Sequence, residues 1–166
     1  MAHHFQVYFG KYWVLLYFGI FCSFSRIDNL FTLLNKSVLV TEVTSGIKVS
    51  VDTNYSGRYF RRNGSLYLFS YNVTIENQSQ YEVQLLGRHW YIFDSTGGVD
   101  EVVGDGVIGL QPVLEPGQSH TYTSGCNLTT PIGKMEGTYQ MERLMDGRKF
   151  EVNIPSFTLV IPHLLN

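Results

Sequence analysis

Hydrophobic and polar residues alternate with a period of two along most of this 166-residue chain, from residue 41 onward. Alternation of this kind, interrupted by turn residues, is typical of strands with one buried face. The clearest segments are GIKVSV, YLFSYNVTI and VQLLGRHWYIF, followed later by HTYTSGCNL, TYQMERLM, KFEVNI and FTLVI. No stretch after residue 41 keeps apolar residues at helical spacing for three turns. The pattern therefore predicts an all-β domain of seven or more strands.

Strands of this number and spacing favour an antiparallel β-sandwich, with a β-barrel as the alternative. Trp90, in the middle of a predicted strand, is expected to fill the space between two sheets. Alternation also predicts which side chains share a face. One face of residues 67–75 holds Tyr67, Phe69, Tyr71, Val73 and Ile75. In residues 83–93, Leu86, Arg88, Trp90 and Ile92 are expected on one face, and Leu85, Gly87, His89, Tyr91 and Phe93 on the other.

Turn residues separate the predicted strands, in ENQSQ, DSTGG, EPGQS, TPIG and MDGRK. The pair Asp146-Gly147 lies between ERLM and RKFEV. An Asp-Gly pair between two alternating segments predicts a hairpin with a two-residue loop.

Composition divides the chain near residue 40. Residues 1–39 hold ten of the 24 aromatic residues, no proline and a charge of +2, from three basic residues and one acid. Residues 40–166 carry all five prolines, 14 of the 16 glycines and a charge of −4, which gives the formal total of −2. We therefore expect an extension at 1–39 and one domain at 40–166, long enough to bury its own core.

The extension contains an uncharged run, YWVLLYFGIFCSF, at residues 12–24. This run is short for a transmembrane helix, and no small-residue cleavage site for a signal peptide follows it. Three interpretations stay open: a membrane-associating segment, a buried helix packed on the domain, or translated sequence upstream of a misplaced start. The aromatic-rich, acid-poor composition favours the third, with Leu39 or Val40 as the natural first position.

The charge and the cysteines exclude some classes of function. A chain of net charge −2 has no basic footprint for nucleic acid. Cys22 and Cys126 lie far apart, which suits a reducing compartment better than a disulfide framework. Tripeptides of the N-glycosylation form begin at five asparagines and are read as incidental: Asn35, Asn63, Asn72, Asn77 and Asn127.

The stretch GDGVIGLQP, residues 104–112, has the G-x-G-x-x-G spacing of dinucleotide-binding loops. In those loops a helix begins at the glycines and its N-terminus faces the phosphates. Here Pro112 and Pro116 follow Gly109 closely, and proline in a helix interior costs about 3 kcal/mol. The sequence therefore predicts a β-turn or bulge in which glycine provides positive φ or close backbone packing.

These segments together resemble the ApaG family. The resemblance covers about residues 40–166 and leaves 1–39 unmatched. Its specific parts, in order, are RHWYIFDSTG, GDGVIGLQPVLEPG and PIGKMEGTY, with FSYNVTIEN before them and FEVNIPSFTLVIP after them. The unmatched start agrees with the misplaced-start interpretation.

The resemblance implies an immunoglobulin- or fibronectin-III-like β-sandwich and no established enzymatic activity. It implies a small soluble cytoplasmic bacterial protein, linked to cobalt resistance and magnesium efflux. Eukaryotic proteins that contain the domain, an F-box protein and a polymerase-delta-interacting protein, imply a protein-interaction module. The family's glycine motif corresponds to Gly104, Gly106 and Gly109, and its signature includes Arg88, His89 and Trp90. Gly87 stands where many relatives have a basic residue, so a basic patch here is thinner.

No group of residues has the spacing of a catalytic or metal site. His89 and Asp94 fall on opposite faces of one predicted strand, so His89 is read as a polar or hydrogen-bonded side chain. His120 and Cys126 share a face but lie about 20 Å apart at the rise of a strand, too far for a nucleophile and its base. The sequence predicts no enzyme, no cofactor and no metal site.

Arg88 begins the face on which Trp90 lies, so its charge must be paired or lie at a rim. One hypothesis is an ion pair with Glu101, Asp105 or Glu115. The other is that Arg88 and the amides of the turn at Gly104, Gly106 and Gly109 hold an anion such as pyrophosphate.

Two functions follow from this sequence. The first is a non-enzymatic protein-interaction module with an unidentified protein partner, for which strand addition at a sheet edge is one mode of binding. The second is a small-ligand binder for a nucleotide, pyrophosphate or a divalent cation, using the glycine turn and the carboxylates Asp100, Glu101 and Asp105. Neither involves nucleic acid, or a membrane for the main domain. Edge strands leave homodimer formation open.

Overall fold

A computed structural model describes residues 8–9, 12–13, 39–62 and 64–164. The chain divides into two compact units, residues 1–36 and residues 37–166. In the first unit, β1 (Tyr8–Phe9) pairs antiparallel with β2 (Tyr12–Trp13). The uncharged run at 12–24 lies otherwise outside the described residues. No helix in the described part of the chain has the length and apolarity needed to span a bilayer.

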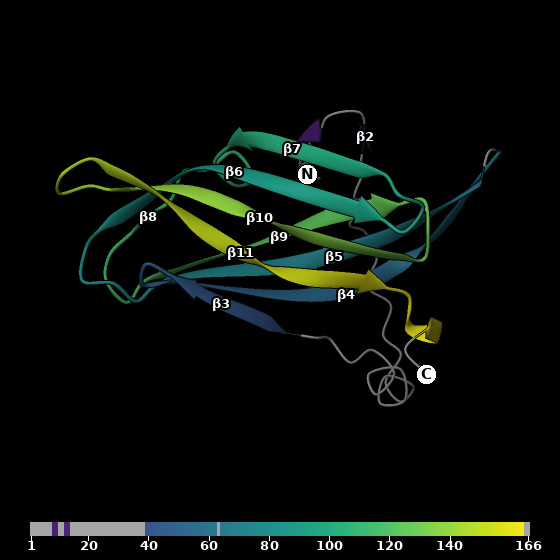
Figure 1. The fold of residues 1–166 in the computed structure, drawn as a ribbon, viewed down its shortest axis with the longest axis horizontal. Helices are drawn as coiled ribbons and strands as arrows, with labels where there is room; N and C mark the ends of the chain where they lie inside the picture. The colour runs from purple at the N-terminus through teal and green to yellow at the C-terminus, as the bar shows by residue number, and fades with distance from the viewer. Residues whose placement is uncertain (1–7, 10–11, 14–38, 63, 165–166) are drawn as a thin grey trace, which may run out of the picture. The chain divides into compact units, whose positions relative to one another are not determined.

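The second unit consists of two antiparallel sheets (Figure 1). One has the order β3-β4-β5-β9, and the other has the order β11-β10-β6-β7 with β8 also paired to β6. The strands of the first sheet are β3 (Val40–Thr44), β4 (Ile47–Arg61), β5 (Gly64–Asn77) and β9 (Ser119–Leu128). Those of the second are β6 (Val83–Asp94), β7 (Val99–Asp105), β8 (Val113–Leu114), β10 (Ile132–Arg143) and β11 (Arg148–Val160). A 3₁₀ turn, η1 (Pro162–Leu164), follows.

The predicted sandwich is confirmed, because the strands form two sheets that enclose a common core. Trp90 is buried there, with its ring 5.7 Å from that of Tyr71 in the first sheet and 5.9 Å from that of Phe157 in the second. Phe69, Tyr71, Val73 and Ile75 are buried together, as alternation predicted for β5. Trp90 therefore fills the space between the sheets.

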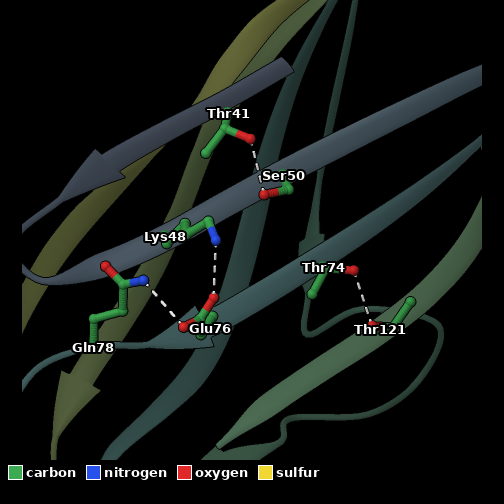
Figure 2. A network of polar contacts seen from close by, with 7 residues as sticks. All are labelled: Thr41, Lys48, Ser50, Thr74, Glu76, Gln78 and Thr121. Atoms are coloured by element: carbon green, nitrogen blue, oxygen red, sulfur yellow. Dashed lines mark hydrogen bonds and ion pairs between the residues drawn. The ribbon is translucent and has the colours of Figure 1, made fainter. Parts of the chain in front are cut away.

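The outer face of the first sheet is polar, as expected for a sheet with one solvated face. Hydroxyl pairs join neighbouring strands, Thr41 with Ser50 and Thr74 with Thr121, each at 3.0 Å (Figure 2). Lys48 donates to Glu76 across β4 and β5 at 3.1 Å. These cross-strand pairs fix the register of the strands on the side that faces water.

The predicted face assignment in β6 is wrong for its first half. Gln140 pairs with Gly87 but Met141 pairs with Leu85, so Leu86 is an extra residue in β6. This bulge reverses the phase of alternation, and Leu85 is therefore buried in the core while Leu86 is only half-buried. A one-residue bulge leaves no mark in a hydrophobic pattern, which explains the error.

The hairpin at Asp146-Gly147 exists, but its loop is longer than the predicted two residues. Arg143 of β10 pairs with Arg148 of β11, so four residues form the loop. Gly147, at φ 67°, donates its N–H to the carbonyl of Arg143 at 2.9 Å. Asp146 accepts hydrogen bonds from the Arg143 guanidinium, and these close the loop at its base.

The Arg88 and glycine-turn site

The stretch GDGVIG forms a tight turn after β7, as the two prolines predicted. Val107 and Leu110 form a bridge, with N–H to carbonyl distances of 2.8 and 3.0 Å. Ile108 and Gly109 between them have φ values of 48° and 73°. Two consecutive positive φ values are the geometry of a two-residue hairpin turn of the primed kind. No helix begins here, so the phosphate-binding arrangement of a dinucleotide loop is not formed.

Gly106 connects this turn to the bulge in β6. Its φ is 55°, and a Cβ placed on it would lie 2.1 Å from the carbonyl oxygen of Leu110. Its N–H donates to the carbonyl of Leu86 at 2.8 Å, and the Gln111 side chain donates to the same carbonyl at 2.7 Å. Only glycine fits at position 106, because both the backbone conformation and the space exclude a side chain.

Arg88 lies against the main chain of the same turn. Its Nη1 donates to the carbonyl of Asp105 at 2.9 Å and to the carbonyl of Gly106 at 2.7 Å. Gly104 leaves room for the guanidinium, which is 3.3–3.4 Å from where a Cβ would stand. The structure therefore brings Arg88, Gly104 and Gly106 together, whereas Gly109 is at the exposed tip of the turn.

The carboxylates proposed as partners of Arg88 are placed differently. Glu101 lies 3.2 Å from Nε2 of His89 and forms an ion pair with it when the histidine is protonated. Asp105 offers Arg88 its main-chain carbonyl. His89 also packs its ring 4.3 Å from that of Tyr91, so His89 is a hydrogen-bonded side chain on the outer face of β6, as predicted.

Behind Arg88, three tyrosines lie in the core between the sheets. The hydroxyls of Tyr122 and Tyr139 are 2.5 Å apart. Burial raises the pKa of Tyr71 to about 12, and a hydrogen bond with Ser124 and the charge of Arg88 offset part of that effect. Burial likewise raises the pKa values of Tyr122 and Tyr139, again partly offset by Arg88. At neutral pH these hydroxyls are protonated and act as hydrogen-bonding groups.

The hydrogen bonds of the turn bear on the anion hypothesis. An anion site needs main-chain N–H groups that face an open concavity. Here the N–H groups of Gly106, Val107 and Leu110 donate to carbonyls within the chain. Arg88 faces carbonyl oxygens, which carry partial negative charge. The arrangement fixes the turn to β6, and anion binding at these residues stays a prediction.

Cys126 and His120 lie on β9, six residues apart, and do not form a dyad. Burial is the largest of the effects that raise the pKa of the Cys126 thiol to about 12, and nearby Asp100 and Asp94 add to it. The thiolate is the nucleophile in cysteine chemistry, so burial disfavours the reactive form of Cys126 at neutral pH. Among residues 39–62 and 64–164, no three His, Cys, Asp or Glu side chains converge as metal ligands would.

Asp94 has a structural partner that alternation alone did not predict. Its carboxylate accepts hydrogen bonds from the N–H and Oγ1 of Thr129, at 2.7 and 2.6 Å, and from Oγ1 of Thr130. Burial by itself would raise the pKa of Asp94, but these hydrogen bonds lower it below its ordinary value. Asp94 therefore holds the end of β6 to the segment in which the chain crosses from β9 to β10.

Asn77 is the other polar residue that sequence reasoning missed. Its side chain is fully buried. Nδ2 donates to the carbonyls of Tyr81 and Leu114 at 2.7 and 2.9 Å, and Oδ1 accepts from the N–H and hydroxyl of Ser79. The sequence showed Asn77 only as part of a glycosylation tripeptide, a reading that its burial excludes for the folded chain.

Comparisons with known proteins agree with this architecture. The family model of the ApaG domain matches residues 58–143. Protein ApaG of Anaeromyxobacter dehalogenans is 49% identical over 126 residues, which are 76% of this chain and 98% of that protein. Protein ApaG of Brucella abortus is 47% identical over 124 residues, 75% of this chain and 95% of the relative.

Two solved structures are also similar. The X-ray structure of the Northeast Structural Genomics Consortium target SoR45 has a TM-score of 0.69 and 40% identity, and the match covers 72% of this chain and 89% of that one. The putative ApaA protein from Bordetella pertussis has a TM-score of 0.62 and 42% identity, covering 70% and 94%. With its two-sheet sandwich, its signature turn at Gly104–Gly109 and nearly full-length relatives at close to half identity, this chain belongs to the ApaG domain family.

Proposed function

We propose that this ApaG-domain protein is a non-enzymatic protein-interaction module that binds an extended segment of a partner by strand addition at β7. The observation that carries the proposal is a free edge of the second sheet, at β7. Among the described strands, β7 pairs with β6 alone, so its other edge leaves main-chain donors and acceptors open. An added strand satisfies those groups and gains affinity from main-chain hydrogen bonds.

The side chains of β7 indicate the kind of segment that would bind. Val99 and Val103 lie four residues apart on one face of β7 and are 53% and 73% exposed. Together they leave an apolar surface open to solvent. Asp100, Glu101 and Asp105 give the same strand a charge of −3. Because Val99, Glu101 and Val103 share a face, a segment whose side chains at every second position are alternately apolar and basic complements both features.

The chemistry of the domain favours binding over catalysis. The buried tyrosines and Cys126 have pKa values far above neutral, so they supply neither an acid–base pair nor a thiolate. The ligand-binding alternative has less support, because Arg88 and three turn amides already bond within the chain. In this proposal the protein acts in the cytoplasm, and a connection with cobalt or magnesium, which the ApaG resemblance implies, operates through the partner.

The test is to select peptides that bind the full chain from a random displayed library and measure their affinities by calorimetry. We expect peptides in which apolar and basic side chains alternate along one face. Affinity should fall at least tenfold in Val103→Asp, because an apolar contact is lost and the new carboxylate must give up its water against an apolar side chain. Val43→Asp is the matched control, since Val43 is 55% exposed on β3 of the other sheet. Peptides that bind both variants equally well would contradict the proposal.

A further inference from the structure

The β4–β5 hairpin extends beyond the strands that flank it. β3 pairs with β4 only as far as Val51, and β9 pairs with β5 only from Tyr67 onward. Residues 57–62 and 64–66, which we call the arm, therefore include a two-stranded ribbon with an open edge on each side. The arm projects past the end of the sandwich (Figure 1).

The arm carries exposed aromatic rings and positive charge. Tyr59 and Phe60 are 61% and 71% exposed. The Arg58 guanidinium lies 4.6 Å from the ring centre of Phe60 and 5.3 Å from that of Tyr67, which orders this part of the ribbon. Arg58, Arg61 and Arg62 are the only charged residues between positions 53 and 75. The arm is thus a basic, aromatic protrusion with charge +3 on a domain of net charge −4.

Nucleic acid and an acidic protein surface are the two classes of polyanion that such an arm could bind. Three arginines would neutralise few phosphates, and the rest of the domain carries −7 and repels a long polyanion. A protein strand with carboxylates and exposed apolar side chains fits better, because arginine and aromatic residues are enriched at protein interfaces.

The β7 edge of the same chain has the complementary pattern. Pairing the β4 strand of the arm antiparallel with β7 in one register places Tyr59 opposite Val103 and Arg61 opposite Glu101, and it brings Arg62, in the turn just after β4, near Asp100. On the outer face of the pair, an arginine then meets a carboxylate and an aromatic ring meets a valine. Opposite charges and apolar pairs directly across antiparallel strands are both stabilising.

We propose that the arm of one copy of this chain adds to the β7 edge of a second copy, in a reciprocal pair in which each copy gives its arm and receives the other's. This inference rests on the proposed function, strand addition at β7, and names the strand that is added. The reciprocal arrangement uses the same two surfaces on both copies, as a twofold interface does.

Charge reversal tests the inference, with the full chain and sedimentation velocity over a concentration series at low salt. We expect the unaltered protein to form a dimer that weakens at high salt. The arm variant, Arg61→Glu with Arg62→Glu, and the edge variant, Asp100→Arg with Glu101→Arg, should each dissociate at least ten times more readily. In each of them, the arm and the edge carry charge of the same sign.

Mixing these two variants gives the decisive result. The arm variant has an acidic arm and an acidic edge, and the edge variant has a basic arm and a basic edge. Both contacts are complementary in a mixed pair, so the mixture should form the heterodimer although neither variant pairs with itself. The control variant, Arg148→Glu with Lys149→Glu on β11, changes the net charge as much as the arm variant does and should still dimerise.

Several results would overturn the inference: a monomer at all concentrations, a dimer that the arm and edge variants leave intact, or no association in the mixture. A larger open assembly would overturn the reciprocal pairing. If the protein is monomeric but peptides still bind at Val103, the proposed function stands and only the identity of the partner is wrong. Circular dichroism of each variant shows that a lost dimer is not a lost fold.

Discussion

At the scale of single residues, the buried amide of Asn77 links three segments of the chain. It joins the end of β5 to the loop after it and to β8, through four hydrogen bonds. Main-chain bonds of the same residue to Gly117 and Gln118 hold the turn before β9. A buried polar side chain that satisfies this many partners fixes several segments at once.

Asn77→Ala should therefore lower the free energy of unfolding by about 3 kcal/mol, because buried carbonyls lose their donor without gaining water. Urea unfolding followed by tryptophan fluorescence measures the change. Asn72→Ala is the control: Asn72 is exposed on the outer face of β5 and accepts one hydrogen bond from Thr123, so the expected loss is below about 1 kcal/mol. Equal losses in the two variants would show that the Asn77 network does not stabilise the fold.

At the scale of the elements, the approach of β10 to β6 depends on a residue with no side chain. The register of β10 against β11 shifts between Met135 and Gly137. A Cβ on Gly137 would lie 2.1 Å from the carbonyl oxygen of His89. Gly137, the second glycine of the signature PIGKMEGTY, thus allows two central strands to pack without a gap.

Gly137→Ala should destabilise the domain by about 3 kcal/mol or more, since the strands must separate to admit the methyl group. Gly98→Ala is the matched control, because nothing lies within 4 Å of its Cβ position. We expect its effect to stay within about 0.5 kcal/mol. Thermal unfolding of the two variants, compared by calorimetry, checks the difference. A Gly137→Ala protein as stable as the control would show that the strands separate at no cost.

The same element-scale reasoning explains why the glycine motif is not a nucleotide loop. Its glycines meet two needs of the β-fold, a primed turn at Gly109 and a close backbone contact at Gly106. The spacing G-x-G-x-x-G is therefore compatible with two unrelated structures, and the residues after it decide between them. Pro112 and Pro116 supplied that decision in the sequence.

At the scale of the whole molecule, the chain has to cross from one sheet to the other several times, and Asp94 secures one crossing. The hydrogen bonds from Thr129 and Thr130 favour the ionised carboxylate, so its pKa is lower in the folded than in the unfolded chain. A group of this kind contributes stability above its unfolded pKa, about 3.9. That contribution is lost as the pH falls through the lower folded pKa.

Asp94→Ala should therefore cost about 1–3 kcal/mol of unfolding free energy at pH 7. The difference from the unaltered protein should shrink steadily below pH 4, where the unaltered protein loses the ionised carboxylate as well. Urea unfolding at several pH values measures both effects. The control is Asp105→Ala, which removes an exposed carboxylate with no hydrogen bond to it among the described residues. Its difference in unfolding free energy from the unaltered protein should stay small at every pH. A pH-independent loss in Asp94→Ala would contradict the assignment.

The sequence by itself determined much of this fold. Period-two alternation and turn residues sufficed for an all-β sandwich, for the buried face of β5 and for Trp90 in the core, because burying one face of a strand requires alternation. The prolines excluded a helix at the glycine motif. The order and spacing of the signature segments were enough for the ApaG resemblance, which the relatives confirm.

Only the tertiary structure decided the features that depend on contacts between distant segments. The bulge at Leu86 reverses the faces of β6 because of how it meets β10 and the turn at Gly106. Arg88 donates to the carbonyl of Asp105, seventeen positions away, and Asn77 donates to that of Leu114, 37 positions away. Asp94 accepts from Thr129, 35 positions away. A local sequence pattern indicates whether a segment prefers strand, turn or burial. It does not indicate which distant main-chain groups a side chain will contact, because register and packing set those partners.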